Sequence, residues 1–176
     1  MPLRLGPLTI PWPVAAHRDD PYWDLFINRP VADPNNLVSH LMAMAPEGNV
    51  NPAKADLHSP EITAAHIKEF AAYLGADFVG IVDGGPASER PYAIVCGVKA
   101  EYDPATAPGV GGQAPAVDSQ YVSFIVAAYI RELGYRATSA TDPDAATLAA
   151  RAGLPANRSI HVAEVIRTDL PLAADA

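Results

Sequence analysis

Prolines constrain this chain most, because they divide it into two unlike parts. The first 57 residues are crowded with Pro, Asn and Asp, as in "PWPVAAHRDDPYWDLFINRPVADPNN". Proline fixes φ and has no backbone N–H to donate, which disfavours long helices and strands there. Large aromatic side chains in this part still need burial: Trp12, Tyr22, Trp23 and Phe26. We therefore predict an extended arm over residues 1–57, with a short helix at 36–44, that packs on the body or on a neighbouring subunit.

Residues 58–176 carry the signals of regular structure. Ser59 and Pro60 are typical of the N-cap and first position of a helix. Apolar residues follow at helical spacing up to Gly75, a natural helix terminator. Two apolar runs, "FVGIV" and "YAIVCGV", then predict buried strands.

The second half of this body continues the alternation. A Gly/Pro/Ala-rich loop precedes a helix predicted at 118–133. Next come a strand at "YRATSA", a short helix opened by Asp142 and Pro143, and a last strand at "SIHVAEVIR". Alternating strands and helices predict an α/β or α+β class.

Composition excludes several classes of protein. The chain has 176 residues, which suits one domain, and a net charge of -8 without a basic stripe, which disfavours nucleic acid as a partner. No apolar run reaches the roughly 20 residues of a membrane-spanning helix. The proline-broken start shows no secretory signal, so we expect a cytoplasmic protein that does not bind membranes. The single cysteine, Cys96, excludes an internal disulfide and a cysteine-ligated iron–sulfur cluster within this sequence.

Few residues point to chemistry on spacing alone. Cys96 lies in an apolar strand and is interpreted as a buried, inert thiol. The five histidines show no helical metal-ligand spacing and are interpreted as surface or hydrogen-bonded residues, so no metal ligands are predicted. "GVGGQAP", at 109–115, matches no phosphate-binding motif and is interpreted as a flexible loop, which could close over a flat ligand. Tyr102 and Asp103 follow a strand, where ligand-binding groups are common, although an Asp-Pro turn explains Asp103 as well.

A series of short motifs resembles a known family. "LGADFVGIV", "YAIVCGVKAEYD", "YIRELGYRA", "LAARAGL" and "AEVIRTDLPL" stand in one order between residues 62 and 172. This series resembles the corrinoid-binding domain of reductive dehalogenases and epoxyqueuosine reductases. The resemblance implies an α+β fold, with a nitroreductase-like mixed sheet flanked by helices that holds a base-off cobalamin.

The sequence also departs from that family's pattern. Relatives continue past "TDLPL" into a segment whose cysteines carry two [4Fe–4S] clusters, whereas this sequence has one cysteine in all. Relatives follow the "AGL" motif with a glycine-rich stretch against the corrin, and here "PANRS" leads directly into the next strand. About fifteen residues are missing by this comparison, so residues 155–159 are interpreted as a trimmed site.

The resemblance also suggests which residues act. Tyr121 is the candidate for the family's catalytic tyrosine, although the best register places that position near Ala116. Asp103 is retained at the end of its strand, as a second catalytic candidate or a local structural group. Tyr102 and two remnants of the trimmed stretch, Asn157 and Arg158, are the candidate cofactor-binding residues.

Three hypotheses follow. In the first, the domain binds cobalamin and works as an oxidoreductase on a small-molecule substrate, with electrons or methyl groups supplied by a separate partner. In the second, it is a cofactor-free subunit or interaction protein that keeps the fold and binds a partner protein or a second copy through its arm. In the third, it binds flavin like a nitroreductase. No basic cluster for the flavin phosphate is recognisable in the sequence, although Arg131, Arg136 and Arg158 could contribute from separate elements.

The arm hypothesis leads to a direct prediction. Deleting residues 1–50 should lower the mass of the oligomer measured by light scattering, because the arm is expected to bury its aromatic side chains across a subunit interface. An unchanged mass would refute the intersubunit role of the arm.

Overall fold

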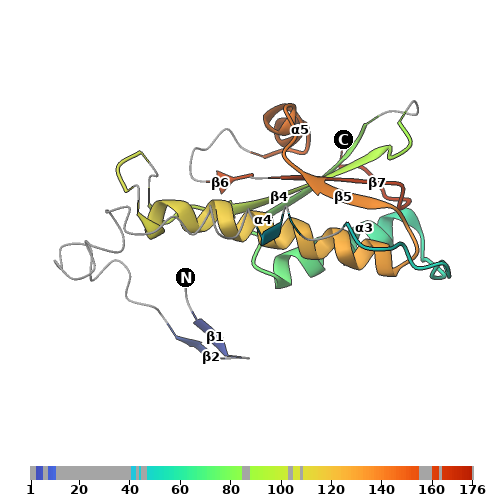
Figure 1. The fold of residues 1–176 in the computed structure, drawn as a ribbon, viewed down its shortest axis with the longest axis horizontal. Helices are drawn as coiled ribbons and strands as arrows, with labels where there is room; N and C mark the ends of the chain where they lie inside the picture. Colours follow the sequence, from blue (N-terminus) through green and yellow to red (C-terminus); the bar gives the residue numbers. More distant parts are fainter. Residues whose placement is uncertain are drawn as a thin grey trace.

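The computed structural model describes residues 3–5, 8–10, 41–42, 44, 47–84, 88–102, 105–107, 109–154, 160–162 and 164–175. A five-stranded sheet forms its centre (Figure 1). Helices α3 and α4 cover one face of this sheet, and α5 covers the other. The predicted α+β class is confirmed. We expected a mixed sheet, but every strand pair in the described part is antiparallel.

Strand β4 (Tyr92–Lys99) is the middle of the sheet. It pairs along one edge with β3 (Phe78–Asp83), and along the other with β7 (Val165–Thr168) and then with β6 (Ile160–His161). Strand β5 (Ala137–Ala140) pairs with β7 and lies at the far edge. We predicted one last strand over "SIHVAEVIR", and this was wrong, because that segment forms the two separate strands β6 and β7.

Helix α3 (Pro60–Tyr73) begins as the sequence predicts. The Ser59 side chain accepts a hydrogen bond from the backbone N–H of Ile62, and Pro60 is the first helical residue. Ile67 and Ala71 are fully buried against the sheet. On the opposite face, Leu148 and Ala149 of α5 (Ala145–Arg151) pack on Val82 and Val95. The apolar run of β4 is therefore covered on both sides, as a strand without polar alternation requires.

Helix α4 (Val110–Glu132) is longer than predicted. We expected a loop at "GVGGQAP" and a helix from about residue 118, but the helix starts directly after Gly109 and contains Pro115. Gly112 and Pro115 are buried against the sheet. Burial of this face outweighs the low helix propensity of glycine and the hydrogen bond that proline cannot make.

Helix α5 also starts later than predicted. Asp144 stands at its N-cap without a side-chain hydrogen bond. We expected Asp142 to be the cap, but its carboxylate accepts hydrogen bonds from the Arg167 guanidinium at 2.7 and 3.0 Å and from the Asp144 N–H at 2.8 Å. The Arg167 guanidinium, followed by the Asp144 N–H, holds the pKa of Asp142 below its ordinary value. Asp142 therefore links the segment that leads into α5 to strand β7.

The last residues of the described chain close the edge of β3. Leu170 and Leu172 are buried in the core, and the Ala173 N–H donates to the Pro60 carbonyl at 3.2 Å. Asp175 then exchanges hydrogen bonds with Ile81, through its N–H at 2.9 Å and its carboxylate at 2.7 Å, and pairs with Lys68. An exposed strand edge can pair with strands of other chains. At Ile81, Asp175 takes up the backbone N–H and carbonyl of the β3 edge that such a strand would use.

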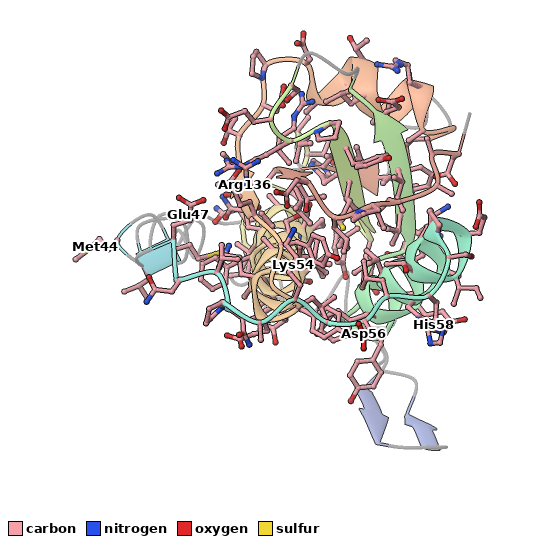
Figure 2. All side chains as sticks on the ribbon, turned by 90° about the vertical axis from the view of Figure 1, so that its right-hand side faces the viewer. Met44, Glu47, Lys54, Asp56, His58 and Arg136 are labelled. Carbon is pink, nitrogen blue, oxygen red and sulfur yellow. The ribbon has the colours of Figure 1, made fainter. Side chains whose placement is uncertain are left out.

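Residues 47–57, which we call the strap, cross the C-terminal end of α4 (Figure 2). The N–H groups of Asn51 and Ala55 donate to the carbonyls of Arg131 and Leu133 at 2.9 and 3.0 Å. These carbonyls lie in the last turn, where a helix lacks internal donors. The Lys54 ammonium also lies 4.6 Å from the centre of the Tyr135 ring. The strap thus supplies hydrogen-bond donors to two backbone carbonyls at the C-terminal end of α4.

Most of the arm lies outside the described residues, including its four aromatic side chains and most of the helix predicted at 36–44. Strands β1 (Leu3–Leu5) and β2 (Leu8–Ile10) pair with one another in a separate two-stranded sheet. No helix in the described part combines the length and apolar character needed to cross a bilayer.

Gly134 tests the packing of the strap. Its φ is +86°, and a Cβ there would lie 2.7 Å from the Ala53 oxygen and from the Lys54 Cα. Gly153 has nearly the same φ, +84°, with nothing within 4 Å of its Cβ position, and it is a matched control. Gly153→Ala should cost only the strain of the left-handed backbone, about 1 kcal/mol. Gly134→Ala should cost about 3 kcal/mol or more, because backbone must also move.

The measurement is the free energy of unfolding in urea for both variants. Equal losses would mean that the strap does not pack on Gly134 in solution.

Cys96 gives a second test of the core. The thiol is fully buried, and burial raises its pKa to about 12. The reactive thiolate is therefore almost unpopulated at pH 8. A thiol reagent such as Ellman's should leave the native protein unmodified and react with one thiol per chain in denaturant. Rapid reaction of the native protein would contradict this burial.

Candidate functional site

The candidate site lies where β4 ends, and β6 and α4 begin there as well. Ile160 and His161 pair with Lys99 and Val98, the last two residues of β4. A Cβ on Gly97 would lie 2.6 Å from Ile160 Cγ2, so only glycine lets β6 lie this close. The pairing therefore brings the end of β4 and the start of β6 to one end of the sheet. Helix α4 also starts at this end and contacts β6 (Figure 1).

Of the predicted site residues, the structure describes Tyr102 and Tyr121. Tyr102 is buried and follows β4 by three positions. Asp103, Asn157 and Arg158 lie outside the described residues, but Asp103 follows Tyr102 directly, and the other two precede Ile160 by two or three positions. Tyr121 lies roughly 16 Å along α4 from its start and is half exposed. It belongs to the helix face turned away from the sheet.

The start of α4 is the main electrostatic feature of this end. Gly109 is its N-cap and makes no side-chain cap hydrogen bond, and the first turn holds no acidic residue. The first N–H groups of a helix lack internal partners and carry the positive end of the helix dipole. This arrangement favours a ligand with a negative or hydrogen-bond-accepting group.

His161 is a polar residue that the sequence did not single out. It pairs with Val98, whose side chain lies on the same sheet face as Cys96, the face that α4 covers. Its Nε2 atom is buried and has no hydrogen-bond partner in the part of the chain that the structure describes. We interpreted all five histidines as surface or hydrogen-bonded residues, and for this nitrogen that was wrong. A buried polar atom without a partner costs free energy unless a ligand or water satisfies it.

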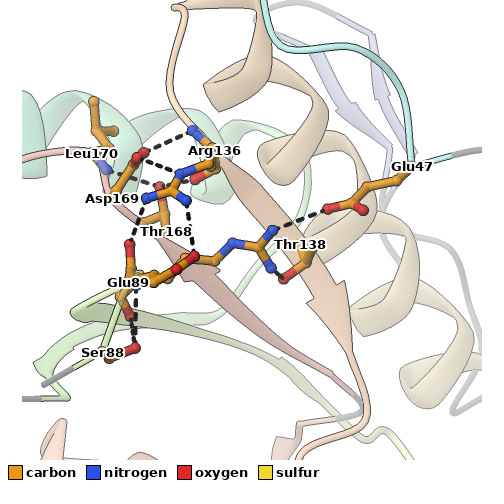
Figure 3. A network of polar contacts seen from close by, with 9 residues as sticks. Glu47, Ser88, Glu89, Arg136, Thr138, Thr168, Asp169 and Leu170 are labelled. Carbon is orange, nitrogen blue, oxygen red and sulfur yellow. Dashed lines mark hydrogen bonds and ion pairs between the residues drawn. The ribbon is translucent and has the colours of Figure 1, made fainter.

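A second polar cluster lies at the opposite end of β4 and holds the fold together (Figure 3). The Arg136 guanidinium and backbone N–H bind the Asp169 carboxylate at 2.9 and 2.7 Å. Arg136 also donates to the carboxylate and carbonyl of Glu89, each at 3.0 Å. These partners, Asp169 first, raise the pKa of Arg136. Arg90 continues the cluster, donating to the Thr138 hydroxyl at 2.8 Å and pairing with Glu47 of the strap at 3.5 Å.

The arginines considered for a flavin phosphate are engaged inside the protein. Arg131 is buried and donates to the Ala137 carbonyl at 2.8 Å. Burial lowers its pKa, and Glu47 and Glu132 oppose that shift. Arg136 is held by Asp169 and Glu89, and Arg158 lies outside the described residues. Arg131 and Arg136 therefore give the flavin hypothesis no support.

The described residues hold no group of three or more His, Cys, Asp or Glu side chains that could bind a metal ion. His58 and His66 do approach one another, with ring centres 5.9 Å apart in an edge-to-face contact.

Comparison with known proteins gives structural relatives only, since no protein-family model and no curated protein matches the chain. The catabolic reductive dehalogenase NpRdhA, N-terminally tagged, matches over 80% of this chain and 24% of its own, with 27% identity and a TM-score of 0.65. A structure described as suggesting a mechanism for B12-dependent dehalogenation matches over 80% of this chain and 23% of its own, with 25% identity and a TM-score of 0.63.

NpRdhA in complex with 3-bromo-4-hydroxybenzoic acid matches over 81% of this chain, with 25% identity and a TM-score of 0.63. The chain spans about a quarter of the length of these solved structures. The likeness agrees with the resemblance that the sequence motifs indicate. These 176 residues therefore contain a reductive-dehalogenase-like domain.

Proposed function

We propose that this domain binds a cobalamin-type corrinoid at the end of β4 and takes part in reductive chemistry at its cobalt. The observation that carries the proposal is the likeness to reductive dehalogenases over 80% of the chain, one of them described through B12-dependent dehalogenation. When bound, a corrinoid supplies a redox-active cobalt within its own macrocycle.

The groups at the end of β4 fit a large, polar-edged cofactor. The uncapped start of α4 offers backbone N–H groups to a phosphate or amide oxygen. His161 Nε2 offers a buried hydrogen-bonding position without a partner among the described residues. Tyr102 adds a buried aromatic ring. In the proposal, Asn157 and Arg158 complete the site from the segment before β6.

The proposal assigns limited roles to the chain's own residues. Tyr102, Asn157 and Arg158 hold and orient the cofactor, and the apolar residues around them exclude water. Asp103 is proposed as a polar group beside the ligand. Electrons come from outside these 176 residues, because the only cysteine in the sequence, Cys96, is buried in the core. Dehalogenase-like reduction of a small molecule is the reaction class that the relatives favour.

The alternative is an interaction protein that has the same fold but binds no cofactor. One observation favours it: helix α4 carries apolar side chains on its outer face as well as on its buried face. A helix that is apolar on both faces is normally covered on both. The groups at the end of β4 have no role in this alternative. An experiment that measures cofactor binding therefore separates it from the cobalamin proposal.

The deciding experiment records absorption spectra of the purified protein after it is mixed with hydroxocobalamin or with FMN and then desalted. We expect the corrin band to stay with the protein and to shift to the base-off form. Loss of both cofactors at micromolar protein would exclude both binding proposals, and retention of FMN alone would favour flavin.

Two arginines on neighbouring segments allow a matched comparison. Arg158→Ala should weaken cobalamin retention about tenfold, the loss of one charged hydrogen bond. Arg151→Ala is the control, since its guanidinium donates to the Asp83 carbonyl at 2.8 Å and belongs to the α5 face. Equal affinities of the two variants would remove Arg158 from the site.

A further inference from the structure

Helix α4 presents a regular apolar stripe on the side turned away from the sheet. The stripe consists of Ala114, Val117, Tyr121, Ile125 and Ala128, which we call the outer stripe of α4. Tyr121 is 50% exposed, and the other four side chains are half-buried. The buried face of the same helix includes Ser119, Val122 and Val126. Figure 1 shows the sheet above α4 and the opposite side of the helix turned away from it.

The outer stripe is symmetric about Tyr121. Val117 and Ile125, both β-branched, lie four positions before and after it, and Ala114 and Ala128 lie seven positions before and after it. Val110 and Glu132 are the next residues on this face, each eleven positions from Tyr121, and both are exposed. A two-fold interface at Tyr121 places the residue n positions before it against the residue n positions after it in the other copy, so each such pair must be complementary. At the margin of the stripe, this pairs Asp118 with Phe124.

The charges at the two ends of α4 fit the same arrangement. Its first turn contains no acidic residue, and its N-cap makes no side-chain hydrogen bond. Glu132 stands at its last position, where a negative charge meets the negative end of the helix dipole. In an antiparallel pair, Glu132 of each copy lies beside the uncapped start of the other α4. Each acid then meets a positive helix end.

The strap is bound to α4 at the C-terminal end of the helix. Its hydrogen bonds to α4 are made at Arg131 and Leu133, beyond the end of the outer stripe. The alanines at both ends of the stripe also allow two helix backbones to approach closely.

We propose that two copies of this chain associate through the outer stripe of α4, with the helices antiparallel about a two-fold axis at Tyr121. The contact pairs Tyr121 with Tyr121, Val117 with Ile125, and Ala114 with Ala128 of the other copy. One helix pair buries less area than a standard stable interface, so the dimer is concentration-dependent. This inference does not depend on the proposed cofactor.

The first test is the mass of the full chain by sedimentation velocity between about 1 and about 100 μM, a range that spans weak association. The mass should rise from one copy towards two. Tyr121→Glu should weaken association at least tenfold, since it places two like charges on the axis. Tyr73→Glu on α3 is the control, because Tyr73 is 86% exposed and lies outside the stripe. A mass of one copy throughout, or equal losses in both variants, would overturn the proposal.

The second test reads the register by cysteine cross-linking under mild oxidation. Cys96 stays in place because it is buried. Tyr121→Cys alone should form a disulfide-linked dimer, since disulfides need Cα atoms within about 7 Å. Ala114→Cys and Ala128→Cys should cross-link only when mixed, because like positions lie about 21 Å apart across the axis. Tyr73→Cys measures random collision.

Each other outcome has a distinct meaning. Cross-linking of Ala114→Cys with itself would indicate parallel helices and would overturn the proposed register. No cross-link above the Tyr73→Cys level, together with a mass of one copy, would mean that the stripe is covered by other residues of the same chain or by a different protein. Melting temperatures close to the unsubstituted chain show that each variant is folded.

Discussion

The structure depends on the burial of strand β4 on both faces and both edges. Residues 93–98 are almost wholly inaccessible, and their side chains alternate between two cores. One core, with Ile94 and Cys96, is closed by α3 and α4, and the other, with Ala93 and Val95, is closed by α5. An apolar strand is stable only when both of its faces are shielded from water. The apolar run of β4 therefore requires helices on both sides of the sheet.

The same strand creates the candidate site. Along the second edge of β4, β7 pairs only with residues 92–95. Further along the same edge, Val98 and Lys99 pair with β6. That pairing brings the start of β6 beside the end of β4, where α4 begins. The opposite end of β4 is tied by Arg136, Asp169 and Glu89 into a closed polar network. One end of the sheet is therefore engaged internally. At the other end, the described residues give the His161 Nε2 atom no hydrogen-bond partner, and the N-cap of α4 makes no side-chain hydrogen bond.

Sequence patterns predicted the parts that depend on local chemistry. The Ser59 cap, the apolar strands and the glycines at 75, 134 and 153 stand where they were expected, each of these glycines with positive φ. The errors occur where contacts distant in sequence decide. Arg167 takes the Asp142 carboxylate away from the α5 cap, and burial of Pro115 extends α4 through a glycine-rich segment. His161 could not be recognised from its neighbours, because its burial depends on pairing with Val98.

Helix α4 connects the two proposals without making them depend on one another. Its start contributes backbone N–H groups at the end of β4, whereas its outer stripe is centred on Tyr121, roughly 16 Å along the helix. Tyr121 was considered for catalysis because of a resemblance in sequence, yet its side chain belongs to the face opposite Ser119, whose hydroxyl donates to the Cys96 carbonyl. A half-exposed tyrosine at the centre of a symmetric apolar stripe is better explained by contact with a second copy. In the pair, the Glu132 carboxylate of one copy and an anionic group of a bound cofactor would compete for the same N–H groups at the start of α4 in the other copy.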